Sequence, residues 1–503
     1  MPQPSICTEG EGHERLDETL RAAIRPARPR CGDGPRRRRA PGLPLVSNVF
    51  AASPPGQDLR QPPVERSKDG LLDVSLKARI GTYELGGRTV HLRGFDGGPV
   101  GRTLDIEAGD TLRLQLVNEL PFDPLEYLCT AYPVPGENAP RGFNVTNMHV
   151  HGVHVSPRAP ADDIFLLLRS GETFNYVYDV HREHPPGTYF YHAHFHGSVA
   201  LQVASGMSGG LIIRGEMDRI PEIAAAEEKV MVIQTQRFNK DGICDNYEIR
   251  KTGDQYYVNG QVNPVIRMRP GEVQRWRLVN ASHMFAVDLK LGKWPMTALC
   301  YDGNPLPKAK EVDHVLLIPG NRADVLVKGF APGVYYLIGG ETVGTLATVV
   351  FEGEPHEMPL FAGDLPEIPA LKPITEKEVT YGRRLEFGMT YAPPRVHYLI
   401  NNQPFSCTET WKIPLNAVEE WEVYNHTEDP HPFHIHINPF QVVSGGDVEP
   451  GIWLDTLELP PFERITFRTR FSTYTGKFVF HCHNLTHEDM GMMQAVEVVE
   501  RDI

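Results

Sequence analysis

The chain has 503 residues, of which 41% are hydrophobic, and a formal net charge of -14 at pH 7. This length allows about three domains with large cores, and the negative charge argues against nucleic acid as a partner. The sequence contains no run of about 18 apolar residues, so it predicts no transmembrane helix. With 46 glycines, 44 prolines and few long helical patterns, it favours an all-β chain with many turns.

Seven cysteines are scattered along the chain without a CxxC pair. They are Cys7, Cys31, Cys129, Cys244, Cys300, Cys407 and Cys482. A disulfide framework needs denser spacing, so the sequence predicts none, although one or two long-range bridges stay open.

Residues 1–65 differ from the rest, because arginine and proline crowd them and the first lysine is Lys68. Apart from one short helical stretch at 14–25, this segment cannot bury a core and is predicted to be a disordered tail. Residues 36–39 are four arginines that precede the weakly apolar run APGLPLVSNVFAAS, which is roughly the layout of a twin-arginine export signal. The run contains prolines and a glycine and starts far from Met1. A periplasmic or extracellular location is therefore one hypothesis; a cytoplasmic one, and a start codon set too far upstream, stay open.

One ten-residue pattern occurs three times: GDTLRLQLVN at 109–118, GEVQRWRLVN at 271–280 and NAVEEWEVYN at 416–425. Each copy alternates like a half-buried strand and ends in asparagine. Trp276 and Trp421 occupy the same place in the last two copies. Repeats of this kind indicate units with one common fold.

A second pattern closes each unit, with a period-2 strand, a turn containing glycine and another strand. Its copies are GETFNYVYDV with GTYFYHAH (171–194), GNRADVLVKG with GVYYLIGG (320–340) and FERITFRTRF with GKFVFHCH (462–483). The two patterns follow each other in the same order three times, which chance similarity between β-strands does not explain. We expect three homologous Greek-key β-sandwich domains at 66–215, 216–365 and 366–503, with a linker at 353–373.

Histidine pairs occupy matching places in the first and third domains. HAH at 192–194 in the first domain aligns with HCH at 481–483 in the third, and the middle domain has IGG at this place. NMHVHG in the first domain and HPFHIH in the third follow the first-pattern strands, and the middle domain has ASHMFAVDL at the corresponding place. Residues two apart on a strand point to one face, so each HxH aims two imidazoles in one direction. If the first and third domains meet, eight imidazoles converge and suit several copper, zinc or iron ions. They are His149, His151, His192, His194, His434, His436, His481 and His483.

Cys482 lies between two of these histidines and must point to the opposite face, into the third domain. There it can meet His431, His487 and Met492. Two imidazoles, one thiolate and a weak thioether make a blue-copper electron-transfer site. Zinc is the rival metal for histidines alone, but strand neighbours on opposite faces cannot share one tetrahedral ion.

Other candidate ligands are interpreted as structural residues. His196 forms a competing HxH pair with His194, but the repeat alignment selects His192 and His194. The remaining histidines lack a partner motif, and two methionines are expected to pack in the core. These residues are His154, His181, His184, His283, Met490 and Met493.

With these motifs, residues 66–503 resemble the multicopper oxidases, specifically the three-domain, laccase-like enzymes of bacterial type. The resemblance implies three cupredoxin-like domains and four copper ions per chain. It implies a type 1 copper at His431, Cys482, His487 and Met492, and type 2 ligands at His149 and His434. One type 3 copper is implied at His151, His192 and His483, and the other at His194, His436 and His481.

The resemblance also implies the reaction, in which four one-electron oxidations of phenols, aromatic amines or similar donors are coupled to reduction of O2 to two waters. Electrons would enter near the imidazole edge of His487 and continue along Cys482 to the cluster. Members of the family use carboxylates to supply protons. Our choices are Glu488 and Asp162, with Asp163 as the competitor of Asp162; surface placement or ion pairing is the alternative for each.

Several other functions stay open. A cuprous-ion oxidase of copper tolerance often carries a methionine-rich insertion, which the 13 thinly spread methionines do not provide. HCHN with an axial methionine is also similar to bilirubin-oxidising and spore-coat-type members, and this axial ligand implies a lower type 1 potential than leucine. A copper-free scaffold predicts missing ligands, yet all twelve positions are filled, and a copper nitrite reductase normally has two domains. The expected partners are O2 and a small-molecule donor, and the expected state is a monomer.

Overall fold

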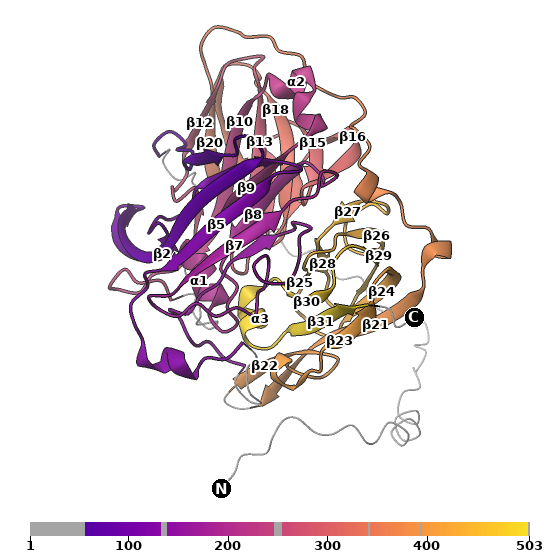
Figure 1. Cartoon of the computed structure of the whole chain (residues 1–503). Coiled ribbons are helices and arrows are strands. Elements are labelled where there is room, and N and C mark those ends of the chain that lie inside the picture. The colour runs from indigo at the N-terminus through magenta and orange to yellow at the C-terminus, as the bar shows by residue number, and fades with distance from the viewer. Residues whose placement is uncertain (1–55, 132–137, 246–253, 341–342, 393–394, 501–503) are drawn as a thin grey trace, which may run out of the picture.

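The computed structural model describes residues 56–131, 138–245, 254–340, 343–392 and 395–500. Their strands form six sheets, which pair along the chain into three β-sandwiches (Figure 1). We call them the first (β1–β9), middle (β10–β20) and third (β21–β31) sandwich. The prediction of an all-β chain of three such units is confirmed, while the residue boundaries of the domains stay predictions. Of the helices in the described ranges, none is long and apolar enough to cross a membrane.

The first sandwich pairs a five-stranded with a four-stranded sheet. In sheet order, the five strands are β1 (Val64–Arg66), β4 (Thr103–Glu107), β9 (Ser208–Arg214), β8 (Gly187–His192) and β6 (His149–His151). The four are β3 (Arg88–Phe95), β2 (Leu71–Leu85), β5 (Thr111–Asn118) and β7 (Thr173–Asp179).

The middle sandwich pairs a six-stranded with a five-stranded sheet. The six are β11 (Gln255–Val258), β10 (Glu227–Gln236), β13 (Val273–Asn280), β18 (Arg322–Lys328), β15 (Met296–Tyr301) and β16 (Asn304–Val312). The five are β12 (Val265–Met268), β20 (Thr345–Phe351), β19 (Gly333–Ile338), β14 (Val287–Leu291) and β17 (Val315–Leu317).

The third sandwich again pairs six strands with five. The six are β22 (Arg395–Ile400), β21 (Tyr381–Ala392), β24 (Ala417–Asn425), β29 (Arg464–Phe471), β26 (Phe440–Ser444) and β27 (Trp453–Leu454). The five are β23 (Trp411–Pro414), β31 (Met493–Val499), β30 (Gly476–Cys482), β25 (His431–Ile435) and β28 (Thr456–Leu459).

The helices are short and lie in the connections. They are η1 (Pro124–Leu128), α1 (Val199–Ser205), η2 (Glu216–Arg219), α2 (Pro221–Ala224), η3 (Pro369–Leu371), η4 (Glu376–Glu378), η5 (Phe405–Cys407) and α3 (Leu485–Asp489). Two of them pack together where the first and third sandwiches meet, because Val199, Ala200 and Val203 of α1 bury Leu485 of α3 (Figure 1).

The repeated sequence patterns form equivalent strand pairs. β5 pairs antiparallel with β7, β13 with β18, and β24 with β29. The asparagine that ends each first-pattern strand has one common role. The amide nitrogens of Asn118, Asn280 and Asn425 each donate to two or more backbone carbonyls of the following connections. Each amide oxygen accepts from the backbone N–H two residues on. The asparagine thus fixes the exit from the strand, which explains its place in all three copies.

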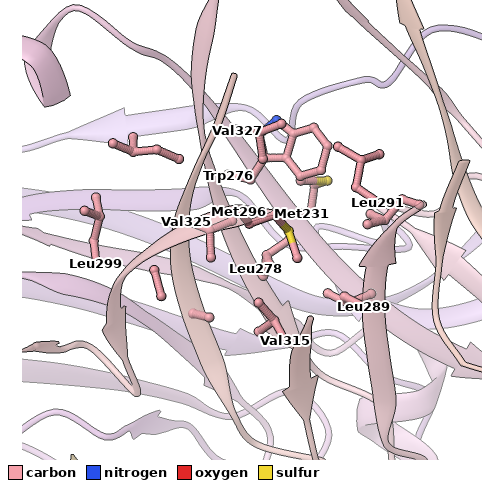
Figure 2. Close-up of a cluster of buried hydrophobic side chains, with 14 of the residues drawn as sticks. Met231, Trp276, Leu278, Leu289, Leu291, Met296, Leu299, Val315, Val325 and Val327 are labelled. Atoms are coloured by element: carbon pink, nitrogen blue, oxygen red, sulfur yellow. The ribbon is translucent and has the colours of Figure 1, made fainter. Parts of the chain in front are cut away.

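Each sandwich has its own apolar core. Figure 2 shows the middle one, in which Trp276 lies among aliphatic and methionine side chains. Trp421 takes the equivalent place in the third core. Both indoles are fully buried, and each Nε1–H finds an acceptor two residues earlier, on Gln274 and Glu419 respectively.

The expected disordered tail extends too far, because its last residues are held against the sandwiches. Val64–Arg66 pairs in parallel with β4, and the backbone at Asp58 bridges Val265 of the middle sandwich. The backbone N–H of Arg60 donates to Gln261 Oε1 at 2.7 Å. Residues 1–55, with the predicted helix and export signal, lie outside the described residues.

The expected linker at 353–373 carries η3 and no strand, and Leu365 packs into the middle core. Cys129, Cys300 and Cys482 are buried free thiols, and Cys244 is buried as well. Cys7 and Cys31 lie outside the described residues.

Candidate metal centre

The four HxH pairs meet between the first and third sandwiches. Strand register places His149 opposite His192 in the first sandwich and His434 opposite His481 in the third. Rings from the two sandwiches then interleave: His149 stacks on His436, and His151 on His434, each with ring centroids 3.8 Å apart. All eight histidines are buried. A cluster of eight imidazoles therefore forms within one chain.

Three imidazole nitrogens of this cluster form a tight triangle. The Nε2 atoms of His194, His436 and His481 are 3.1 to 3.3 Å apart. An ion at the centre of such a triangle would lie roughly 1.9 Å from each nitrogen, close to the ~2.0–2.1 Å of metal–imidazole bonds. Three neutral imidazoles cannot all donate to one another, so the arrangement fits a shared cation better than mutual hydrogen bonding.

Two further sets of ligand atoms lie within 4.8 Å of one another, namely His151, His192 and His483, and His149, His151 and His434. In three of these residues, one ring nitrogen is within hydrogen-bond distance of an oxygen atom. The Nδ1 atoms of His149, His192 and His434 lie 2.8 to 2.9 Å from Asp162 Oδ2, Ala193 O and Asp455 O, respectively. Their Nε2 atoms are buried and have no hydrogen-bond partner among the described residues. Anchoring one nitrogen to orient the other is the usual second contact of a metal-ligating histidine.

Burial and mutual repulsion lower the pKa values of histidines in the cluster. Burial, followed by repulsion from neighbouring imidazoles, holds the pKa of His149, His436 and His483 well below 6.5. A lowered pKa favours the neutral form of these three rings, and neutral imidazole is the form that binds metals.

A separate thiol site lies on the other face of β30. Cys482 belongs to the third core, as Ala193 belongs to the first core at the matching position. Cys482 Sγ lies 3.4 Å from His431 Nδ1 and 3.8 Å from His487 Nδ1, and the two nitrogens are 3.2 Å apart. Strand alternation thus separates Cys482 from its histidine neighbours, so the HCH stretch contributes to two separate groups of candidate ligands.

The expected thioether is held close to this thiol site. Met492 is fully buried in the same core as Cys482. The Cys482 backbone N–H donates to Met492 O, and the Met492 N–H donates to His487 O. Burial raises the pKa of the Cys482 thiol, whereas a bound cation favours the thiolate.

The two carboxylates chosen from the sequence lie beside cluster histidines. Glu488 is fully buried, with Oε2 3.1 Å from His481 Nδ1 and Oε1 3.5 Å from His194 Nδ1. Burial raises its pKa to about 7, although His194 opposes the rise. Asp162 Oδ2 lies 2.8 Å from His149 Nδ1, whereas Asp163 caps the backbone N–H of Phe165. The geometry therefore favours Asp162 over its competitor.

The residues interpreted as structural stay out of the ligand sets that the described residues form. His196, His154, His181, His184 and His283 belong to none of these sets. Met493 is buried in a small cluster, and Met490 packs against the third core.

The sequence reasoning missed several residues around the cluster. Asp455 lies 3.0 Å from His151 Nε2 and also holds Arg322 of the middle sandwich. Tyr398 covers one face of His487. Neither belongs to a histidine motif, and Arg322 lies in the domain without HxH pairs, so only the three-dimensional arrangement could identify them.

Comparison with known proteins agrees with this arrangement. Three family models described as multicopper oxidase match residues 141–218, 226–350 and 371–502. A laccase of Haloferax volcanii is 25% identical over 504 residues, covering 89% of this chain and 86% of its own. The multicopper oxidase mco of Staphylococcus epidermidis is 26% identical over 454 residues, covering 86% and 90%.

Solved structures share the same architecture. The crystal structure of a laccase from Pediococcus acidilactici is 26% identical with a TM-score of 0.73, covering 89% of this chain and 95% of that one. A multicopper oxidase from Campylobacter jejuni, described as a metallo-oxidase, has a TM-score of 0.73 at 22% identity and covers 88% and 96%. This second likeness concerns the fold alone.

Proposed function

Because the chain belongs to the multicopper oxidases, a family of copper-dependent oxidoreductases that use O2, we propose that it is a laccase-like member. In this proposal it couples four one-electron oxidations of a phenolic or similar small donor to the reduction of O2 to two waters. A relative named laccase that aligns over most of the chain supports this donor class.

Four copper ions per chain are proposed, each at one of the sets of buried ligand atoms. The type 1 ion would be held by His431, Cys482, His487 and Met492, and the type 2 ion by His149 and His434. The type 3 ions would be held by His151, His192 and His483, and by His194, His436 and His481. The sets of three histidines and the His–Cys–His set coincide with groups whose ligand atoms lie within 4.8 Å of one another.

Copper, when bound, supplies the one-electron chemistry at the thiolate site and the oxygen chemistry at the histidine cluster. The protein joins the two sites through its own backbone, since Cys482 is the chain neighbour of His481 and His483. Glu488 holds a proton close to His481 and His194, and Asp162 fixes the orientation of His149. Burial of the whole cluster keeps bulk water away from it.

The single observation that carries the proposal is the Nε2 triangle of His194, His436 and His481. It joins both sandwiches, and its size suits one transition-metal ion. A copper-free scaffold has no need for three buried nitrogen lone pairs aimed at one point.

Purified protein loaded with copper tests the proposal. We expect about four coppers per chain and O2 uptake with a methoxyphenol. One copper per chain without O2 uptake would contradict the oxidase function. Donors compared in parallel, namely the methoxyphenol, bilirubin and Cu(I), decide the substrate class: a kcat/KM that is highest for Cu(I) would favour a cuprous-ion oxidase instead.

Two finer points follow from the same proposal. All proposed ligands come from one chain, which supports a monomer. The arginine run at 36–39 supports export to the periplasm or the outside.

A further inference from the structure

The middle sandwich has no HxH pair, yet a short strap from it touches the histidine cluster. The strap is Gly320–Arg322, at the start of β18. Gly320 has a φ of +93°, and a Cβ at this position would lie 3.1 Å from His151 Cε1 and 3.1 Å from His483 Cδ2. The backbone of the middle sandwich therefore packs directly against two proposed copper ligands.

Arg322 extends this contact through a buried ion pair. Its side chain is fully buried, and its Nη1 and Nη2 donate to Asp455 Oδ1 and Oδ2 at 2.8 and 2.5 Å. Nη1 also donates to the carbonyl of Gly320 at 2.8 Å, which ties the guanidinium to its own strap. A two-point fork of this kind fixes the plane of the carboxylate as well as its position.

Asp455 in turn contacts histidines from both copper-binding sandwiches. Its Oδ1 lies 3.0 Å from His151 Nε2 and 3.5 Å from His434 Nδ1. With Nε2 of His151 on the carboxylate, Nδ1 of that ring is the atom left without a partner among the described residues. The carboxylate thus selects which nitrogen of His151 faces the cluster centre.

The Asp455 carboxylate needs Arg322 to stay in place. A second carboxylate, Asp302, is fully buried beside the same guanidinium at 3.4 Å. Two carboxylates in one buried space repel each other, and without the guanidinium between them Asp455 would lose both contacts that fix its position. Asn321 holds Asp302 with its amide at 3.0 and 3.1 Å, so the strap supplies partners to both carboxylates.

We propose that Arg322, in the domain that has no copper ligands, is a positioning residue for the three-copper cluster. It holds Asp455, and Asp455 sets the orientation of His151 and His434. This inference rests on the proposed function. It gives the middle sandwich a part in metal binding beyond that of a spacer.

A purely structural ion pair between domains is the competing explanation, and the chain offers a matched control for it. Arg277 is also fully buried in the middle sandwich and pairs with Asp324 and Asp218 at 2.7 and 3.0 Å. It lies on the neighbouring strand β13, and its side chain donates to Thr188, Asp324, Asp218 and Glu228, none of which is a histidine. Losing Arg277 removes a comparable buried cation without disturbing Asp455.

The experiment compares copper binding in the wild type, Arg322→Met, Arg322→Lys and Arg277→Met. The readouts are copper per chain, the blue absorbance of the type 1 site and the rate of copper loss to a chelator. We expect Arg322→Met to keep the blue copper and to lose the other ions at least about 10-fold faster, the usual effect of removing an outer-shell partner. Arg322→Lys offers one contact instead of two, so its rate of copper loss should lie between those of the wild type and Arg322→Met. Arg277→Met should lose copper at the wild-type rate.

Wild-type copper retention in Arg322→Met, or equal losses in Arg277→Met, would overturn the inference. If Arg322→Met does not fold, Arg322→Lys provides the same comparison. A wild-type protein without cluster copper would instead contradict the proposed function, so the two failures are distinguishable.

Discussion

The ring of Tyr398 lies face to face with the imidazole of His487, with centroids 3.9 Å apart and an angle of 16° between the planes. His487 Nε2 is also 3.2 Å from the side-chain nitrogen of Asn484. Only 5% of the surface of His487 is exposed. His487, the residue at which donors are proposed to give up electrons, is thus covered on one face by Tyr398 and exposes only a small part of its surface to solvent.

Replacing Tyr398 tests whether this clamp matters for donor oxidation. Tyr398→Phe keeps the stacked ring, so we expect kcat/KM for a phenol close to the wild-type value. Tyr398→Ala leaves a void and frees the imidazole to turn. It should lower the free energy of unfolding by about 3 kcal/mol and kcat/KM by roughly 10-fold or more. Steady-state kinetics and thermal melts measure both effects. Equal losses in the two variants would mean that the hydroxyl, rather than the ring, is what matters.

Replacing the thiol should separate the two metal sites. Cys482→Ser removes the thiolate but leaves the histidines on the opposite face of β30. We expect the blue absorbance and phenol oxidation to disappear, while about three of four coppers stay bound. Cys300→Ser is the control, because Cys300 is a buried free thiol in the middle sandwich. A blue Cys482→Ser protein, or one without any copper, would contradict the two-site arrangement.

The repeat made much of the fold and the histidine sets predictable. Strand periodicity fixes which side chains share a face, and three copies in one order fix which histidines are equivalent. The strands β8 and β30 accordingly end within their HxH elements, at His192 and at Cys482, which the alignment places one position apart. Such reasoning predicts a site whose residues belong to a recognisable local motif, such as HxH.

The contacts that cross between sandwiches could not be read in this way. Arg322 and Asp455 are 133 residues apart and lie in different domains, and neither has an unusual local sequence. For the same reason, the sequence did not predict that residues 56–65 pack against the sandwiches. Their partners, such as Gln261, lie about 200 residues further along the chain. Composition marks a segment as unable to form its own core, but it does not say whether another domain offers a surface.

Glu488 gives a test of proton supply. Glu488→Gln keeps the shape of the side chain beside His481 and His194 but cannot cycle a proton. We expect turnover to fall at least ~100-fold, the usual contribution of a positioned acid–base group, with copper content unchanged. Glu419→Gln is the matched control, since Glu419 is also buried in the third sandwich but pairs with Arg383 and Trp421 instead. Unchanged turnover in fully loaded Glu488→Gln would remove Glu488 from the mechanism.

An arginine-rich ion network between the first and middle sandwiches predicts how stability depends on pH. Asp218 lies 2.6 Å from Arg275 and 3.0 Å from Arg277. Burial alone would raise the pKa of Asp218, but Arg275 and Arg277, together with the Gly215 backbone N–H and Arg214, outweigh burial and hold the pKa below its usual value. A lowered folded-state pKa stabilises the fold above the unfolded-state value of about 4, and this stability is lost as the pH falls through the folded-state pKa.

Asp218→Asn should therefore destabilise the copper-free protein most at neutral pH. We expect a loss of roughly 2 kcal/mol at pH 7, less than for a fully buried pair because Asp218 is partly exposed. The difference from the wild type should shrink below about pH 4, where the wild-type carboxyl begins to take up a proton as well. Thermal melts from pH 7 to pH 3 measure it, with Asp241→Asn as a control, since Asp241 and its partner Lys240 are largely exposed. A difference that stays constant down to pH 3 would show that the Asp218 charge is not what Arg275 and Arg277 require.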